Sequence, residues 1–205
     1  MIDLFISAFV TLFVVIDPLG CAPIYAGLSA GADRHQAFVM ALRACVIATL
    51  ILLGFALFGE KLLGALHIGL DAFRIAGGIM LFLIALDMVF ERRTKRREER
   101  AEELQAAHVE DVSVFPMAMP MIAGPGSIAT VMLLMSRAQG LEPSLVILGA
   151  LLLIMVLTFA ALAAAGPLMK LLGERIEAII TRLLGVLLAA LAAQYVIDGL
   201  KTVIG

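Results

Sequence analysis

Charged residues are scarce in this chain of 205 residues, at 16%, whereas 62% of the residues are hydrophobic and the mean hydropathy is +1.08. Soluble domains are roughly 25% charged, so this composition excludes an ordinary water-soluble globular domain. Only two cysteines are present, in or beside apolar segments, which argues against a secreted disulfide framework. The N-terminus lacks the basic region and cleavage site of a signal peptide, so its apolar run is predicted to be a first spanning helix.

Several chemical signatures are also missing. No Walker-type phosphate loop appears, so ATP is not expected to be the direct energy source. The three histidines lie in predicted loops at no metal-ligand spacing, and neither a metal nor another cofactor is predicted. Strict alternation of apolar and polar residues is absent, which argues against a membrane β-barrel.

Long apolar runs are what the sequence does contain. A helix needs about 20 residues to cross a bilayer core of ~30 Å, and the chain has room for six such helices. We therefore predict an all-α, polytopic protein whose surroundings are a lipid bilayer. The predicted spans lie near residues 4–28, 37–58, 73–90, 114–135, 145–165 and 179–199.

Residues 91–111 interrupt this pattern with six basic and seven acidic side chains, which cannot lie in lipid. We interpret the segment as a solvated linker. Its charge is nearly balanced, unlike the positive excess of a nucleic-acid-binding patch, so no nucleic-acid partner is predicted. The linker divides the chain into a first three-helix repeat, residues 1–90, and a second, residues 112–205.

The positive-inside rule predicts the orientation. With six spans, 4 Lys and Arg residues lie on the side of the termini and 11 on the side of the linker. Basic residues accumulate on the cytoplasmic side of a membrane. We therefore predict a cytoplasmic linker and two periplasmic termini.

The two halves resemble each other at matching positions. Gly59 and Gly166 are predicted to end the second helix of each half, 107 residues apart, and the run 74–77 matches the run 182–185 at a spacing of 108. Three spans per half is an odd number, so the halves must enter the membrane in opposite directions. This predicts an inverted 3+3 repeat with broken first and fourth helices, an architecture of many secondary transporters.

The main functional signal is a carboxylate and two prolines inside the first apolar span. Proline removes a backbone donor, and a broken helix at membrane depth must face protein or a wet cavity. An ionisable side chain at the break marks a functional site. The fourth span has a comparable break. The predicted substrate-binding residues are Asp17, Pro18, Gly20, Cys21 and Pro23 at the first break, and Gly124, Pro125, Gly126 and Ser127 at the second.

These breaks predict a site for a small zwitterion. Free N–H groups at the start of a half-helix attract a carboxylate, while Asp17 and exposed carbonyls attract an ammonium group. Ser127 could cap the second half-helix or donate to the carboxylate. Three roles for Asp17 stay open at this point: a helix cap, a substrate ligand, or the carrier of a coupling proton.

The motifs at residues 17–23 (DPLGCAP) and 120–128 (PMIAGPGSI) resemble those of the MarC family of bacterial and archaeal inner-membrane proteins. The resemblance covers essentially the whole chain. That family is similar to the wider group of amino-acid exporters related to the lysine exporter. The resemblance implies a secondary transporter of small solutes in the inner membrane, with small neutral amino acids as substrates. Family members often have asparagine where this chain has Cys21, which bears on substrate preference.

Other functions stay open on the sequence. Re-entrant backbone also builds selectivity filters, so a solute or ion channel is one alternative, and a non-transporting membrane partner protein is another. An enzyme is not predicted, since Ser127 has no histidine or lysine partner at membrane depth. A small-molecule substrate is the predicted partner, and a homo-oligomer is left open.

Overall fold

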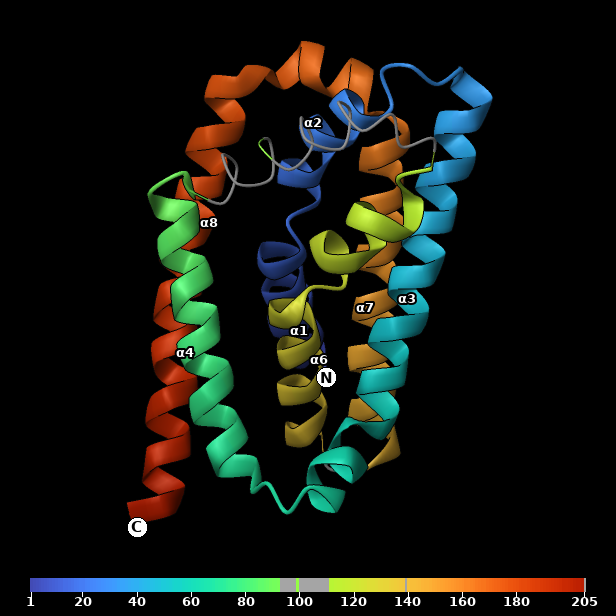
Figure 1. Cartoon of the computed structure of the whole chain (residues 1–205). Coiled ribbons are helices and arrows are strands. Elements are labelled where there is room, and N and C mark those ends of the chain that lie inside the picture. The colour runs from blue at the N-terminus through green and yellow to red at the C-terminus, as the bar shows by residue number, and fades with distance from the viewer. Residues whose placement is uncertain (93–98, 100–110, 139, 205) are drawn as a thin grey trace.

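The computed structural model describes residues 1–92, 99, 111–138 and 140–204, and the regular elements in these ranges are helices (Figure 1). Most of the predicted linker, residues 93–98 and 100–110, lies outside the described residues. The elements are α1 (Ile2–Ile16), α2 (Pro18–Leu28), α3 (Arg34–Ala65), α4 (Leu70–Val89), the irregular helix η1 (Ser113–Ile122), α6 (Pro125–Arg137), α7 (Leu141–Ala163) and α8 (Ala165–Ile204).

The helices account for the predicted membrane spans. Five stretches of the described chain are long and apolar enough to cross a membrane, and η1 together with α6, bent by 52°, makes six when the pair is counted as one broken span. The prediction of an all-α, multi-pass membrane protein is therefore confirmed. The five stretches are Ile2–Leu28, Arg34–Ala65, Leu70–Val89, Leu141–Ala163 and Ala178–Val203.

The two broken spans lie in the middle of the helix bundle (Figure 1). α1 and α2 follow one another along the bundle, and η1 and α6 run in the opposite direction. Each broken span packs against the second long helix of the other half: α1 and α2 contact α7, while η1 and α6 contact α3. The third helices, α4 and α8, pack side by side on one flank. The pairing of helices is thus the same for both halves.

The bundle has two distinct ends (Figure 1). At the first, which we call the linker end, α4 finishes and η1 begins. At the opposite one, the turn end, α3 connects to α4 and α8 finishes. The first part of α8 crosses the linker end before the helix turns along the bundle, and only Ala178–Val203 qualifies as its span.

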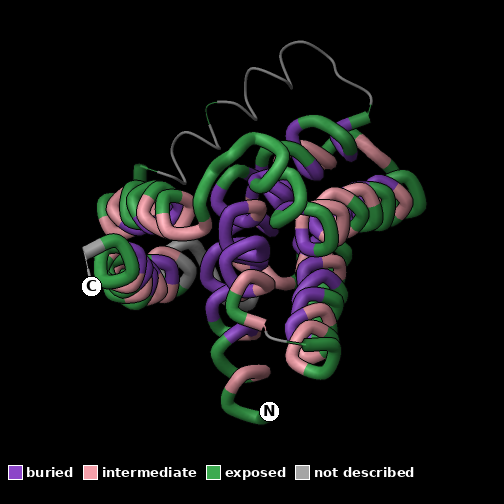
Figure 2. The backbone as a smooth tube through the Cα atoms, turned by 90° about the horizontal axis from the view of Figure 1, so that it is seen from below, coloured by how far each residue is buried: buried purple, intermediate pink, exposed green. Residues whose placement is uncertain are grey.

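Burial is greatest along the two broken spans (Figure 2). Within the most apolar window of Ile2–Leu28, 56% of the residues are buried, against 28% for α4 and for the span of α8. The outer helices therefore expose aliphatic side chains, as expected where a bundle faces lipid hydrocarbon. The broken spans are enclosed by protein, which is what their interrupted hydrogen bonding requires.

Helix starts recur at a constant spacing in the two halves. α2 and α6 begin at Pro18 and Pro125, and α3 and α7 begin at Arg34 and Leu141. The members of each pair are 107 residues apart. This spacing is what a duplication of a three-helix unit would produce, and it agrees with the first of the two spacings found in the sequence.

Glycines allow α4 and α8 to approach closely. A Cβ at Gly185 would lie 2.9 Å from Cβ of Met88, and a Cβ at Gly78 would lie 2.8 Å from the carbonyl oxygen of Ala192. Gly77, which the sequence matched to Gly185, instead faces α6. Small residues at such contacts let the two backbones pack tightly.

The predicted helix ends at Gly59 and Gly166 are wrong. α3 continues through Gly59 to Ala65, and Gly166 lies in the first turn of α8, after α7 has ended at Ala163. Glycine weakens a helix in water partly because it exposes the backbone to solvent. Gly59 is buried against the side chain of Met132 in α6, so water is not available to its backbone and the helix continues.

Candidate functional site

The first break consists of one residue, Asp17, immediately before the predicted Pro18–Gly20 segment. Asp17 is 2% exposed and has a left-handed backbone, with φ 58° and ψ 66°. The ring of Pro18 disfavours the helical conformation at the residue before it, which ends α1 at this point. The Asp17 N–H still donates to the carbonyl of Phe13 at 2.9 Å, so α1 closes normally before the chain turns.

The side chain of Asp17 caps α2. Its Oδ1 accepts a hydrogen bond from the Gly20 N–H at 3.1 Å, and its backbone carbonyl accepts from the Cys21 N–H at 3.0 Å. A Cβ at Gly20 would overlap Oδ2 of Asp17, so only glycine leaves room for the carboxylate. The cap interpretation of Asp17 is therefore confirmed, and the motif glycine is explained by it.

Backbone carbonyls also surround the first break. The thiol of Cys21 donates to the carbonyl of Ile16, with Sγ 3.5 Å from the oxygen, at the point where α1 leaves carbonyls without helical partners. Pro23 lies inside α2 and has no N–H, so the carbonyl of Leu19 lacks its partner within the helix. This region thus combines a buried carboxylate with carbonyl acceptors, a suitable environment for a cation.

The second break lies at Ala123 and Gly124, between η1 and α6. The segment before it is irregular, because Phe115 and Met119 each precede a proline and have extended backbones, with φ near −130°. A Cβ at Gly124 would overlap the carbonyl oxygen of Pro120. Glycine is therefore required at this break for a different reason from the first, since backbone rather than a side chain occupies the space.

The start of α6 differs from the start of α2 in having no carboxylate. Gly124 is the cap residue and has no side chain, and Pro125 takes the first helical position, which suits its fixed φ. Ser127 is the third residue of α6, so the predicted alternative in which it caps the helix is wrong. No side chain in the described structure caps α6. The N–H groups of Gly126 and Ser127 at this helix start therefore receive no acceptor from a capping side chain of the described residues, and they are available to a ligand.

The structure brings the two breaks together halfway along the bundle (Figure 1). A Cβ at Gly126 would lie 3.6 Å from Cγ1 of Val15, a residue that is two positions before Asp17. It would also overlap Cδ1 of Ile84, so α4 closes one side of the junction. The juxtaposition that the sequence predicted from the paired proline and glycine signals is confirmed.

Among the hydroxyl groups of the broken spans, sequence reasoning singled out only Ser127 and missed those of Ser7, Thr11 and Thr130. Thr11 in α1 is 5% exposed, and Thr130 in α6 is completely buried. Oγ1 of Thr130 has no hydrogen-bond partner among the described residues. A usable signal was present: Ser7 and Thr11 are four residues apart, and Ser127 and Thr130 are three apart, so each pair lies on one face of its helix.

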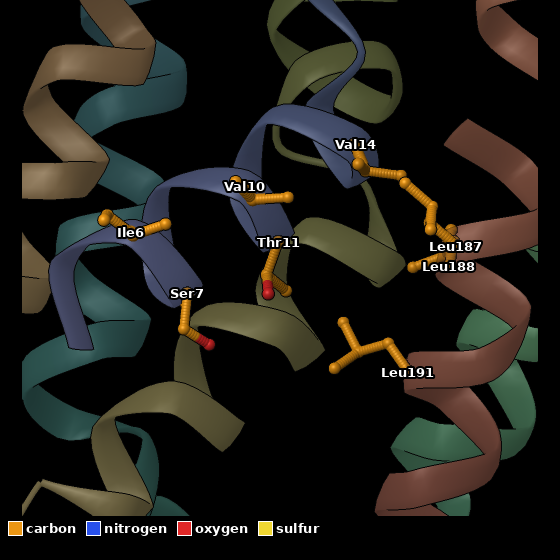
Figure 3. A pocket seen from close by; sticks show the side chains of 8 residues that line it. All are labelled: Ile6, Ser7, Val10, Thr11, Val14, Leu187, Leu188 and Leu191. Carbon is orange, nitrogen blue, oxygen red and sulfur yellow. The ribbon is translucent and has the colours of Figure 1, made fainter. Parts of the chain in front are cut away.

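A cavity of about 340 Å³ lies between α1 and α8 (Figure 3). It contains none of the predicted site residues and instead includes two of the missed hydroxyl groups. Its lining residues are Ile6, Ser7, Val10, Thr11, Val14, Leu187, Leu188 and Leu191. The cavity therefore extends from the region of the breaks along the side of α1 that faces α8.

Charged side chains form ion pairs at the ends of the bundle. At the linker end Asp111 pairs with Arg43 and accepts from the N–H of Ser113 at 2.9 Å. The hydrogen bonds from Ser113, followed by the nearby Arg43 guanidinium, lower the pKa of the Asp111 carboxyl. At the turn end Arg137 pairs with Asp198 at 2.6 Å.

The described residues contain no group of three or more His, Cys, Asp or Glu able to hold a metal ion.

Comparison with known proteins gives a match over nearly the whole chain. Residues 2–204 match the model of a family described as MarC family integral membrane protein. The chain belongs to the MarC family. This confirms the resemblance seen in the two motifs and the multi-pass membrane character of the chain. No solved structure matches the chain.

Three relatives illustrate how far the similarity extends. The MarC-family chain is 35% identical to a UPF0056 membrane protein of Methanocaldococcus jannaschii over 198 residues, which are 96% of both chains. It is 36% identical to a UPF0056 membrane protein of Aquifex aeolicus, with 98% of this chain and 94% of the relative covered. It is 35% identical to the UPF0056 inner membrane protein YhgN of Escherichia coli, with 96% and 95% covered.

Proposed function

We propose that this MarC-family protein is a secondary transporter of small solutes and that its substrates are small neutral amino acids. One observation carries the proposal: two half-helix starts meet inside the bundle, and only one of them is capped by a carboxylate of the protein. Inverted-repeat transporters hold their substrates between discontinuous helices of this kind. The spacing of 107 residues between matching helix starts supports such a repeat.

A zwitterionic amino acid complements the two unequal helix starts. Its carboxylate accepts hydrogen bonds from the N–H groups of Gly126 and Ser127, where the dipole of α6 is positive. Its ammonium group lies toward Asp17, the one carboxylate among the buried residues of the described structure. The substrate carboxylate then caps the start of α6, as the carboxylate of Asp17 caps the start of α2. Close packing of Val15 and Ile84 around Gly126 favours a substrate with a small side chain.

Location and energetics belong to the same proposal. The protein lies in the bacterial inner membrane, where the name of its Escherichia coli relative also places that protein. Both termini are periplasmic, on the basis of the 4 basic residues on their side against 11 on the other. Asp17 is the candidate to carry a coupling proton, since it is the ionisable side chain located where the substrate would bind.

Counterflow into proteoliposomes tests this function. Vesicles loaded with unlabelled alanine or serine should transiently accumulate the labelled amino acid above its outside concentration, because a carrier exchanges one molecule for another. Equilibration without this overshoot, together with electrical conductance, would instead indicate a channel. A thermal-shift screen in detergent gives a second measurement, since a ligand that binds the folded state raises its apparent stability. The absence of both counterflow and thermal shifts for all amino acids would refute the proposal.

A further inference from the structure

We infer that four hydroxyl groups, those of Ser127, Thr130, Thr11 and Ser7, form the path by which the substrate's polar groups move between the helix breaks and the turn end. In this inference the cavity between α1 and α8 is the vestibule of that path. It rests on the proposed transport function, whose site lies at the inner end of the hydroxyl row. The favoured substrates are amino acids with a small aliphatic side chain.

Most of the described hydroxyl groups elsewhere on the helices are hydrogen-bonded within their own helix, whereas the buried Oγ of Ser113, at the start of η1, is not. Six of them donate to a carbonyl three or four residues earlier, at distances of 2.7–3.0 Å. These are the hydroxyl groups of Ser29, Thr49, Ser136, Ser144, Thr158 and Thr202. In the described part of the chain, the four hydroxyl groups of the row make no such bond, and that of Thr130 is completely buried without a partner.

An unpaired buried hydroxyl group destabilises a protein, because it has lost its water partners and gained nothing in return. A helix offers an easy remedy, since a threonine can turn its hydroxyl toward the carbonyl four residues earlier. Thr158, which is equally buried, does so with Ile154 at 2.8 Å. Ser127, Thr130 and Thr11 are buried, and Ser7 is exposed at the outer end of the row. Hydroxyl groups without a bond to their own helix, on three buried residues of two contacting helices, therefore indicate a partner that is not part of the protein, namely water or a polar solute.

The register between α1 and α6 places these groups along one interface. Gly126 lies against Val15, and the two helices run in opposite directions. Thr130, four residues after Gly126, is therefore level with Thr11, four residues before Val15, about 6 Å further along each helix. Residues four apart share a helix face, so Thr11 lies on the side of α1 that faces α6, and Thr130 lies on the side of α6 that faces Val15 of α1 and Ile84 of α4. Ser7 continues the row by one more turn toward the turn end.

The row leads into the cavity. Figure 3 shows the hydroxyl groups of Ser7 and Thr11 on the same side of α1, toward the space that α8 borders. The other six lining side chains are aliphatic. On α8, Leu188 is 1% exposed and lies at the inner side of the cavity wall, whereas the neighbouring Leu187 is 59% exposed. A volume of about 340 Å³ is far larger than one water needs, so it can hold several waters or an amino acid. Aliphatic walls with a line of hydroxyl groups suit an aliphatic amino acid better than an ion.

Two valine substitutions test the path through transport. Thr130→Val keeps the shape of the side chain and removes the unpaired hydroxyl, so counterflow should fall roughly 2- to 10-fold, the worth of one hydrogen bond to the moving solute. The melting temperature should not fall, since no bond within the protein is lost. Thr158→Val is the matched control, because it is equally buried but bonds within α7, away from the path. Wild-type counterflow by Thr130→Val at equal reconstitution would overturn the inference.

Cysteine labelling tests the path without any assumption about the substrate. Ser7→Cys and Thr11→Cys should react with a membrane-impermeant methanethiosulfonate, because thiolates form only where water enters. Wild-type protein, which retains Cys45 and also Cys21 at the first break, supplies the background. Leu153→Cys is the control for a lipid-facing position, with 41% of that leucine exposed on α7.

The labelling outcomes separate the path from the proposed function. Reaction at Ser7→Cys and Thr11→Cys, but not at Leu153→Cys, supports the path even if no amino acid shows counterflow. No reaction at Thr11→Cys would mean that lipid chains fill the cavity, and the path would be refuted even if amino-acid transport is observed. Slower labelling in the presence of alanine would connect the path with the proposed substrate.

Discussion

Replacing Asp17 by asparagine distinguishes a helix cap from a substrate ligand. The variant retains the shape of the side chain and one acceptor oxygen, but it loses the negative charge. The hydrogen bond from the Gly20 N–H, 3.1 Å long in the wild type, can be accepted by an amide oxygen. Asparagine is as good an N-cap as aspartate, so we expect Asp17→Asn to fold and insert normally.

The two roles predict effects of different size. Loss of a negative charge at a helix start costs about 0.3–1 kcal/mol, and up to about 2 kcal/mol where the group is partly buried. A hydrogen bond to a charged group is worth about 1.5–3 kcal/mol, which corresponds to roughly 10- to 150-fold in binding. We therefore expect a small loss of thermal stability and a fall of at least 10-fold in the apparent affinity for amino acids. Asp17→Leu should lose the cap as well and be clearly less stable.

Asp33→Asn is the matched control. Asp33 also caps a helix, accepting from the Gln36 N–H at 2.8 Å at the start of α3, but it is exposed and far from the two breaks. The chemical change is identical, so stability should change slightly and counterflow should not change. Transport by Asp17→Asn with wild-type rate and affinity, in the same preparation as this control, would show that Asp17 is only a cap. If Asp17 carries a coupling proton, the pH dependence of transport should also disappear in Asp17→Asn.

Three further predictions concern packing, pH and orientation. Gly78→Ala should destabilise the protein by about 1–3 kcal/mol in detergent unfolding, because its Cβ would meet the Ala192 carbonyl at 2.8 Å, whereas Gly54→Ala has open space and should not destabilise. Because folding lowers the pKa of Asp111, its carboxylate stabilises the fold at pH values above the unfolded pKa of about 3.9, and this stabilisation is lost as the pH falls through the lower folded pKa. For so exposed an ion pair the stabilisation is under about 1 kcal/mol. In thermal scans, the stability of Asp111→Asn should therefore depend less on acid pH than that of the wild type. A reporter that is active only in the periplasm should be active when fused to the C-terminus, and activity of a cytoplasmic reporter there would reverse the proposed orientation.

The sequence was sufficient to predict the membrane spans and the positions of their breaks. Both follow from local chemistry: apolar runs of about 20 residues have few alternatives to a spanning helix, and Pro18 and Pro125 remove backbone donors wherever they stand. The same reasoning identified Asp17, because a carboxylate in an apolar run is costly without a partner. It failed at Gly59, since the effect of a glycine depends on whether the backbone there has water as an alternative partner.

The tertiary structure decided which of the candidate groups are already paired. Asp17 occupies the start of α2, while the start of α6 has no such cap, although the sequence had left open a cap by Ser127. Thr130 and Thr158 are both threonines within apolar helices, yet only Thr158 bonds to its own helix. The difference arises because an interhelical register, set by the approach of Gly126 to Val15, determines what each side chain faces. Such contacts join residues far apart in the chain, so no local pattern of the sequence contains them.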